Sequence, residues 1–314
     1  MAEQDSPAAI YAQARARGAV LDLSERAKWR LLGADRVRYL NGQVTNDIRR
    51  VRADAAMMAC VTTAKGKLSG IVFVSAAPDF LRIDAEAELR EPLGARLERY
   101  IIADDATLED VTGEECLFHL LPPASASGAA PEIEGAEIRT AMRLGRPGID
   151  VIGPQGERDR LLAALTAERA LIPSALAESM RIEAGVPRWG AELTEETLPP
   201  EAGLEETAID YHKGCYIGQE VISRIKSVGR VNRRLAGFAA SGPLAPGMTL
   251  HAPEEPAKNA GEITSAGWSF GLECWAGLGY VRRGLAHGAY ATLDARTPDG
   301  AAVSVQVREL PLVP

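Results

Sequence analysis

The chain has 314 residues, of which 46% are hydrophobic and 25% are charged, and this composition excludes a disordered or fibrous protein. The formal net charge of −8 at pH 7 excludes a protein that binds nucleic acid over its whole surface, because such proteins carry a broad positive field. The length predicts two or three domains with a sizeable core.

The first twenty residues contain no continuous apolar run, and no later segment approaches the roughly 20 apolar residues that span a bilayer. We therefore expect a cytoplasmic protein, monomeric and without membrane association. The cysteines form no C-x-x-C pair, which suits a reducing compartment. There are four of them: Cys60, Cys116, Cys215 and Cys274.

Residues 20 to 110 alternate short β-type runs with helical patterns. The β-type runs are AKWRLLG, MMACVTT, GIVFVSA and FLRIDA, and one helical pattern is DRVRYLNGQ. In ELREPLGARLERYII, Leu89, Leu93 and Leu97 recur at every fourth position and mark one face of a helix. The pattern predicts an N-terminal α+β domain over residues 1 to 120.

A second α+β domain is expected over residues 121 to 234. It opens with a loop or boundary rich in small residues and proline, at 122 to 135. A hairpin is predicted at 138 to 153, and two helices follow at 157 to 170 and 174 to 185. From 235 to 314, short β-rich segments are separated by Gly, Pro, Asn and Asp, which predicts a C-terminal β-barrel.

The stretch KGCYIGQE, at residues 213 to 220, is the most specific candidate functional motif. The segment that follows has helical character, so Cys215 is expected near a helix N-terminus, where unpaired N–H groups favour an anion. Lys213 adds a positive charge, and both features favour the thiolate. Gly214 and Gly218 leave room for a second molecule near the sulfur. The motif predicts a reactive thiol, and the alternative is a packed cysteine in a glycine-containing turn.

This motif, followed by Arg224 and by GRVNRRLAGF, resembles the signature of the YgfZ-type folate-binding proteins. They are a branch of the superfamily that includes the aminomethyltransferase (T-protein) of the glycine cleavage system and mitochondrial iron–sulfur assembly factors. Residues 24 to 47 and 181 to 204 are similar to other segments of the superfamily. The resemblance implies a three-lobed ring of two mixed α/β lobes and a small β-barrel around a central channel for tetrahydrofolate or a one-carbon-substituted folate.

The resemblance also implies which residues hold the folate. Glu183 matches the position credited with the pterin, whose exocyclic amine and ring N–H form a two-donor edge that a carboxylate accepts. Trp189 matches an aromatic position that lines the channel, and Asn46 lies in a segment that lines it in relatives. The alternatives are an exposed glutamate, a core tryptophan and a helix-cap or turn asparagine. The other expected folate contacts are Gln219, Arg224 and Arg230, while Lys213 joins Cys215 as a candidate catalytic residue.

A run of cations follows the motif in this otherwise acidic chain. It could attract the glutamate tail of a folate or an RNA backbone, and a solvated basic face is the third interpretation. No aromatic residue interleaves with the run, so a tRNA contact is less favoured. The run comprises Arg224, Lys226, Arg230, Arg233 and Arg234.

No permanent metal or cluster site is predicted. His212 and Cys215 form one H-x-x-C pair, but the other cysteines stand at least 55 residues away in the sequence. A transient ligand role for Cys215 stays open.

Two functions from different classes remain, and the N-terminal lobe bears on the choice between them. T-proteins carry an aspartate pair in that lobe, where this chain has Ser69 and Gly70, and neither residue can do carboxylate chemistry. The first hypothesis is a tetrahydrofolate-binding accessory protein for iron–sulfur cluster assembly or repair, with iron–sulfur enzymes or assembly proteins as partners and indirect effects on tRNA modification. The second is a folate-dependent aminomethyl or other one-carbon transferase. The motif favours the first, and catalytic turnover stays open.

Overall fold

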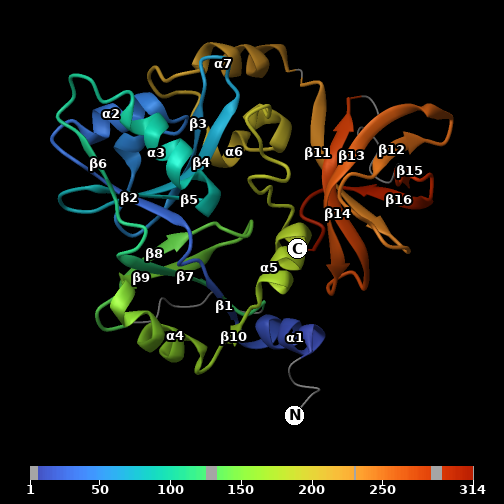
Figure 1. Cartoon of the computed structure of the whole chain (residues 1–314), viewed down its shortest axis with the longest axis horizontal. Coiled ribbons are helices and arrows are strands. Elements are labelled where there is room, and N and C mark those ends of the chain that lie inside the picture. The colour runs from blue at the N-terminus through green and yellow to red at the C-terminus, as the bar shows by residue number, and fades with distance from the viewer. Residues whose placement is uncertain (1–5, 125–132, 230, 284–291, 314) are drawn as a thin grey trace. The chain divides into compact units, whose positions relative to one another are not determined.

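The computed structural model describes residues 6–124, 133–229, 231–283 and 292–313. These form two compact units (Figure 1). Unit 1 comprises Met1–Lys65, Ser69–Pro173 and Glu206–Gln219, and unit 2 comprises Gly66–Leu68, Ser174–Glu205 and Glu220–Pro314. The α-helices are α1 (Pro7–Arg17), α2 (Arg36–Gln43), α3 (Arg90–Glu98), α4 (Arg158–Thr166), α5 (Ser174–Ala184), α6 (Glu205–Ala208) and α7 (Gln219–Val228).

The helical face predicted from the leucine spacing is confirmed. Leu93 and Leu97 lie on α3, and Leu89 lies just before it. Their exposed fractions are 1% for Leu89, 0% for Leu93 and 1% for Leu97. These side chains therefore hold α3 against the core of unit 1.

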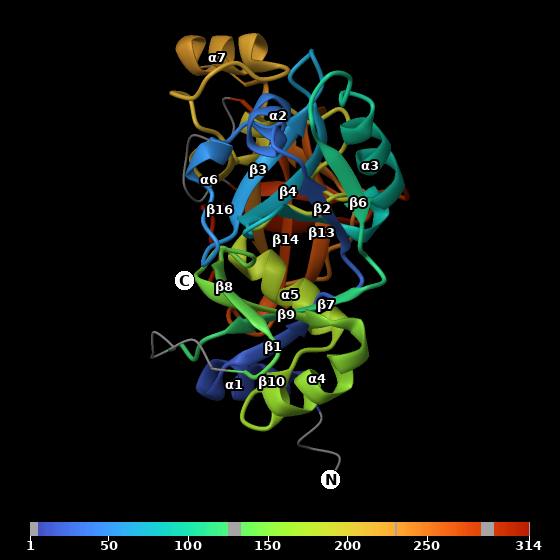
Figure 2. The ribbon, with the colours of Figure 1, turned by 90° about the vertical axis from the view of Figure 1, so that its left-hand side faces the viewer.

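Unit 1 contains two five-stranded sheets, which Figure 2 shows one above the other. We call them the β4 sheet and the β7 sheet. The β4 sheet has the order β3 (Met57–Thr62), β4 (Leu68–Ala76), β5 (Leu81–Ala85), β2 (Ala27–Leu32) and β6 (Thr107–Asp110). The β7 sheet has the order β10 (Ala170–Leu171), β1 (Ala19–Asp22), β7 (Glu115–Leu121), β9 (Gly148–Pro154) and β8 (Glu137–Ala141). In the β7 sheet, β10 pairs in parallel with β1, and the other pairs are antiparallel.

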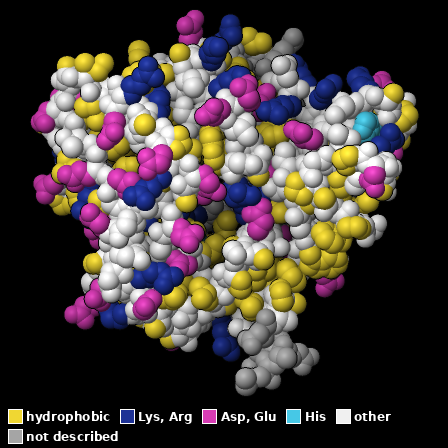
Figure 3. Space-filling view, in the orientation of Figure 1, with side chains coloured by type: hydrophobic (Ala, Val, Ile, Leu, Met, Phe, Trp, Pro, Cys, Tyr) yellow, Lys and Arg dark blue, Asp and Glu magenta, His cyan; other side chains and the backbone are white. Residues whose placement is uncertain are grey.

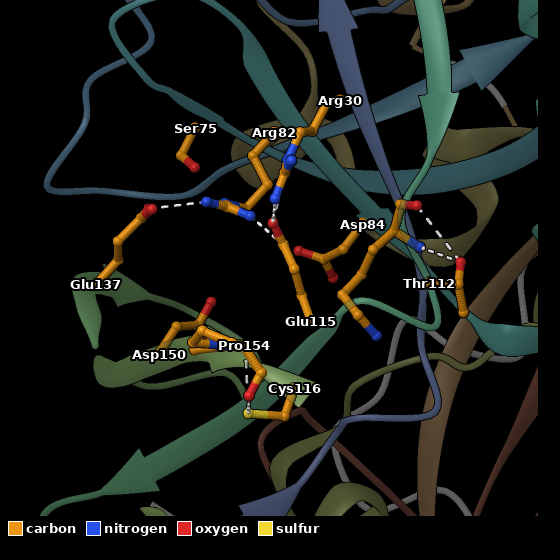
Figure 4. A network of polar contacts seen from close by, with 12 residues as sticks. Arg30, Ser75, Arg82, Asp84, Thr112, Glu115, Cys116, Glu137, Asp150 and Pro154 are labelled. Atoms are coloured by element: carbon orange, nitrogen blue, oxygen red, sulfur yellow. Dashed lines mark hydrogen bonds and ion pairs between the residues drawn. The ribbon is translucent and has the colours of Figure 1, made fainter. Parts of the chain in front are cut away.

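A cluster of mostly buried charges joins the two sheets of unit 1, and only Arg30 in it is half-buried. The members that lie on strands take alternate positions, such as Arg82 and Asp84 on β5, so they project from one face of each sheet. Figure 4 shows Arg82 on its strand reaching toward Glu115 and Glu137, which belong to the β7 sheet. We call this set the ion cluster: Arg26, Lys28, Arg30, Arg82, Asp84, Glu115, His119, Arg139, Arg143 and Asp150.

Two aspartates form the centre of the ion cluster, and Arg143 contacts both. Its guanidinium donates to Asp84 Oδ1 and Oδ2 at 2.9 Å and to Asp150 Oδ1 and Oδ2 at 2.8 Å. Burial by itself would raise the pKa of Asp84, but the charges of Arg143 and Arg26 outweigh it and hold that pKa well below its usual range. Both carboxylates are thus ionised partners of the arginines.

His119 makes this cluster sensitive to acid. Its ring is fully buried, Nδ1 donates to Asp150 Oδ1 at 2.8 Å, and Nε2 has no partner among the described residues. Burial lowers the pKa of His119 below 6.5, despite the opposing charge of Asp150. The unfolded chain therefore binds this proton at a higher pH than the folded chain does.

We expect the free energy of unfolding to be independent of His119 above pH 6.5 and to decrease below it. The slope from this one group should approach about 1.4 kcal/mol per pH unit. Urea unfolding between pH 7.5 and pH 5 would measure it, with His119→Gln as the variant that lacks the titration. Equal slopes in the two proteins would contradict the prediction.

Unit 2 contains a closed six-stranded barrel. The strand order is β11 (Arg233–Ala240), β14 (Cys274–Arg282), β13 (Glu255–Ser269), β12 (Thr249–Ala252), β15 (Thr292–Arg296) and β16 (Ala302–Arg308). Pairing of β11 with β16 closes the barrel, so each of its six described strands pairs with two neighbours. The interior is apolar, with Phe238, Leu250 and Val305 each 0% exposed.

The predicted mixed α/β architecture with a C-terminal β-barrel is therefore confirmed. The ring of lobes and its channel stay predictions. Among the helices of the described residues, none combines the length and the apolar character that a membrane crossing requires.

Candidate functional site

Lys213 of the KGCYIGQE motif is buried, with 5% of its surface exposed. Its Nζ donates to the backbone carbonyls of Asn41 at 2.6 Å, Val44 at 2.6 Å and Asn46 at 2.9 Å. The carbonyls of Asn41 and Val44 lie at the C-terminal end of α2, where a helix leaves carbonyls without intrahelical partners, and Asn46 follows in the next turn of the chain. The ammonium also lies 5.1 Å from the ring centroid of Tyr216. Lys213 thus caps α2 from a distant part of the chain.

Burial lowers the pKa of Lys213 to about 8, because the ammonium loses hydration, and the charge of Asp47 opposes this change. The group therefore remains mostly protonated at neutral pH. An ammonium has three protons, and three carbonyls accept them. This geometry gives Lys213 a positioning role, and the catalytic role predicted for it stays a prediction.

Two threonines add to this attachment of the motif. Thr45 Oγ1 donates to the carbonyl of Ala208 at 2.5 Å, and Thr62 Oγ1 donates to the carbonyl of Ile217 at 2.5 Å. The N–H of Ile217 donates to the carbonyl of Gly42 at 3.2 Å. The loop is therefore tied to the rest of unit 1 on both sides of its cysteine.

Cys215 is exposed, as a reactive thiol requires. A Cβ added at the adjacent Gly214 would meet no atom within 4 Å, so the space beside the thiol is open. The helix predicted after Cys215 is α7, which begins at Gln219, four residues after the cysteine. The effect of a helix end is confined to its first turn. The reactivity predicted for Cys215 thus depends on its exposure and fixed position.

Alkylation should distinguish the four cysteines. We expect Cys215 to be labelled first and the partly exposed Cys274 more slowly. Cys60 and Cys116 should not react in the folded protein, because both are buried and burial raises the pKa of Cys60 to about 12. Peptide mapping by mass spectrometry after short exposure to iodoacetamide would test this order. Labelling of Cys60 as fast as Cys215 would contradict it.

Asn46 is half-buried, and its side chain is engaged with the backbone. Nδ2 donates to the carbonyl of Met58 at 2.9 Å, and Oδ1 accepts from the N–H of Asp47 at 3.0 Å. This is the turn asparagine that the sequence left open as an alternative. A folate contact from Asn46 stays a prediction.

Glu183 lies in the last turn of α5 and is 4% exposed, so the alternative of an exposed glutamate is wrong. Its Oε1 accepts from Ser269 Oγ at 2.7 Å and from the N–H of Gly271 at 2.9 Å. The backbone carbonyl of Glu183 accepts from the N–H groups of Leu312 at 2.7 Å and Val313 at 3.1 Å. Glu183 is therefore a junction of three segments of unit 2.

An ion pair near Glu183 was missed by the sequence analysis. Arg181 Nη1 donates to Glu192 Oε2 at 3.0 Å, and Arg181 Nη2 donates to Ser265 Oγ at 2.7 Å. Glu192 is fully buried and also accepts from Thr264. The spacing of Glu178 and Arg181 on one helix face was the only sequence signal. This pair fastens α5 to the barrel strand β13.

The remaining candidates differ in their surroundings. Trp189 and Gln219 are half-buried, and Arg224 is exposed on α7. Arg230 lies outside the described residues, so its predicted folate contact stays untested.

Within the basic run, Arg233 is paired inside unit 2. It donates to Glu201 Oε2 at 3.0 Å and lies 4.2 Å from the ring centroid of Tyr280. On the face shown in Figure 3, basic and acidic side chains are intermixed. The exposed members Arg224 and Arg234 keep the anion-binding prediction open.

Within the described ranges, no group of three His, Cys, Asp or Glu side chains is placed to hold a metal ion.

Comparison with known proteins decides the family. No protein-family model matches the chain. The tRNA-modifying protein YgfZ of Sodalis glossinidius is 30% identical over 250 residues, which cover 74% of this chain and 75% of that protein. The chain belongs to the YgfZ family. The resemblance identified from the KGCYIGQE motif is thereby confirmed.

More distant relatives place this YgfZ-family chain in the aminomethyltransferase superfamily. The mitochondrial aminomethyltransferase of Gallus gallus is 25% identical over 331 residues, covering 94% of this chain and 81% of that protein. A putative chloroplast transferase of Arabidopsis thaliana is 26% identical, and this chain spans 65% of its length. The glycine cleavage aminomethyltransferase T of Bartonella henselae has the same fold, with a TM-score of 0.86 at 18% identity over 98% of this chain and 90% of that one.

The N-terminal acid pair of T-proteins has no counterpart in this YgfZ-family chain at Ser69 and Gly70 on β4. A Cβ at Gly70 would lie 3.0 Å from Leu89 Cδ1 and 3.1 Å from Leu93 Cδ2. A carboxylate at that position would be pressed against apolar side chains, which disfavours its charged form. An acid at Gly70 would therefore require the side chains of Leu89 and Leu93 to shift by a few tenths of an ångström.

Proposed function

We propose that the protein binds tetrahydrofolate or a one-carbon-substituted folate and acts as an accessory protein in iron–sulfur cluster assembly or repair, with indirect effects on tRNA modification. The exposed Cys215 thiol, on a loop that Lys213 ties to unit 1, is the observation that carries the proposal. A thiol fixed in an open position is accessible to a partner protein, and its thiolate form is a metal ligand that suits transient iron binding. Membership in the YgfZ family supports it, since a member is named a tRNA-modifying protein.

The chemistry of Glu183 fits a pterin. A carboxylate only accepts hydrogen bonds, and the pterin edge only donates them at its amine and ring N–H. The side chain is buried, where such bonds are less screened than in water. Glu183 would hold the pterin, and the aromatic ring of Trp189 would pack against the ligand. When bound, the folate supplies a carrier for a one-carbon group.

A folate-dependent one-carbon transferase is the second candidate. It is supported by the similarity to an aminomethyltransferase over 94% of the chain. The absence of carboxylates at Ser69 and Gly70 weighs against it, because those acids assist proton movement in T-proteins. The accessory function therefore remains the better supported of the two.

Complementation of a strain that lacks the protein would test the proposal. Several iron–sulfur enzymes would be assayed after expression of the wild type, Cys215→Ala or the matched control Cys274→Ala. We expect the wild type and Cys274→Ala to restore activity and Cys215→Ala to fail at equal protein levels. Full restoration by Cys215→Ala would refute the role of the thiol.

A second assay separates the two candidate functions. Purified protein would be mixed with tetrahydrofolate, formaldehyde and aminomethyl acceptors, and consumption of the loaded folate would be followed. The accessory function predicts binding without consumption. Steady consumption with any acceptor would favour the transferase.

A further inference from the structure

The hairpin turn between β13 and β14 is the part of the barrel that contacts Glu183. Ser269, the last residue of β13, is paired with Cys274, the first residue of β14. The preceding pair, Trp268 and Trp275, places two indole rings edge to face, with centroids 6.3 Å apart at 90°. Glu273 takes a left-handed φ of 54°, which closes the turn. The turn therefore has a defined conformation next to a buried carboxylate.

The hydrogen bonds of Ser269 have only one consistent direction. Its Oγ accepts from the N–H of Leu272 at 3.0 Å and lies 2.7 Å from Glu183 Oε1. An ionised carboxylate has no proton to give, so the serine hydroxyl must donate its single proton to Glu183. The N–H of Gly271 donates to the same oxygen at 2.9 Å. Two donors of the turn thus hold one carboxylate oxygen.

Holding one oxygen restricts the rotation of the whole carboxylate group. A glutamate side chain is otherwise one of the most flexible, and ordering it on ligand binding reduces affinity. Ser269 is 1% exposed, so its hydroxyl is not exchanged for water in the folded protein. The carboxylate is therefore ordered before any ligand arrives.

We propose that Ser269, assisted by the N–H of Gly271, is the positioning residue that orients the Glu183 carboxylate for recognition of the pterin edge. This inference rests on the proposed folate binding. It gives the turn of the barrel a function in ligand recognition, in addition to its part in closing the hairpin.

The test is the affinity for tetrahydrofolate of the wild type, Glu183→Gln, Ser269→Ala and Ser269→Thr, measured by calorimetry. Ser269→Ala should weaken binding by about tenfold, the lower end of the range expected for one hydrogen bond to a charged group. Ser269→Thr keeps the hydroxyl and should bind within about threefold of the wild type. The alkylation rate of Cys274, opposite Ser269 in the hairpin, shows whether the turn stays closed, and it should be equal in all four proteins.

The outcomes separate this inference from the proposed function. A wild type that binds no tetrahydrofolate would overturn folate binding itself. Binding that is weakened by Glu183→Gln but unchanged in Ser269→Ala would overturn only the positioning role. Equal losses in Ser269→Ala and Ser269→Thr, together with faster labelling of Cys274, would show a purely structural role and would also overturn it.

Discussion

Replacing Arg143 with methionine is expected to lower the free energy of unfolding by about 3 to 5 kcal/mol, the cost of leaving buried charges without a partner. Arg143 contacts both Asp84 and Asp150, whose side chains are 1% and 0% exposed. Methionine has a similar length, so the change removes the charge and its hydrogen bonds more than it removes packing. Urea unfolding at pH 7.5, where His119 is neutral, would measure the loss.

Arg52→Met is the matched control. Arg52 also pairs with an aspartate, Asp54, at 2.5 Å, but the two side chains are 70% and 64% exposed. Exposed pairs contribute less than about 1 kcal/mol, because water and salt screen them. Similar losses in the two variants would refute the central place of Arg143 in the ion cluster.

Replacing Lys213 with methionine is expected to destabilise unit 1 by about 3 kcal/mol or more. The change removes a buried cation and leaves three carbonyls, those of Asn41, Val44 and Asn46, without their donor. Each buried polar group without a partner costs about 1 to 3 kcal/mol, reduced where water can enter. Thermal and urea unfolding would measure the effect, with Lys65→Met at an exposed position as the control.

The same variant tests the positioning role of Lys213. If the lysine holds the motif loop in place, Lys213→Met should lose complementation although it retains Cys215. The Cys215 labelling rate should also change relative to Lys65→Met. Normal complementation by a destabilised Lys213→Met protein would show that the function does not require the attached loop.

The elements that the sequence predicted well are those with a local cause. The leucines of α3 repeat within one helix, and the barrel strands are bounded by turn residues, so neighbouring positions carry the pattern. The KGCYIGQE motif is likewise contiguous, and it was sufficient to identify the family. Exposure of Cys215 was also expected from its glycine neighbours.

The ion cluster was not predicted because its partners are far apart in the sequence. Arg82 and Asp84 alternate on a strand as solvent-exposed residues do, and nothing local shows that the β7 sheet covers them. That sheet joins β1 (Ala19–Asp22) to β7 (Glu115–Leu121) and β9 (Gly148–Pro154), which come much later in the sequence. Arg82 and Asp84 are therefore buried and paired only because the β7 sheet packs against the β4 sheet in the folded chain.

By itself, the sequence determined the family, the types of element and the position of a candidate thiol in a specific motif, because these depend on neighbouring residues. Only the tertiary structure showed the contacts of Lys213 and Glu183. Lys213 contacts carbonyls about 170 residues away, as in its bond to Val44, and Glu183 contacts Ser269, 86 residues away. The local sequence around a charged side chain is the same whether water or a buried partner binds the charge. The free energy of the charge differs between these two environments only when folding brings a distant partner into contact with it.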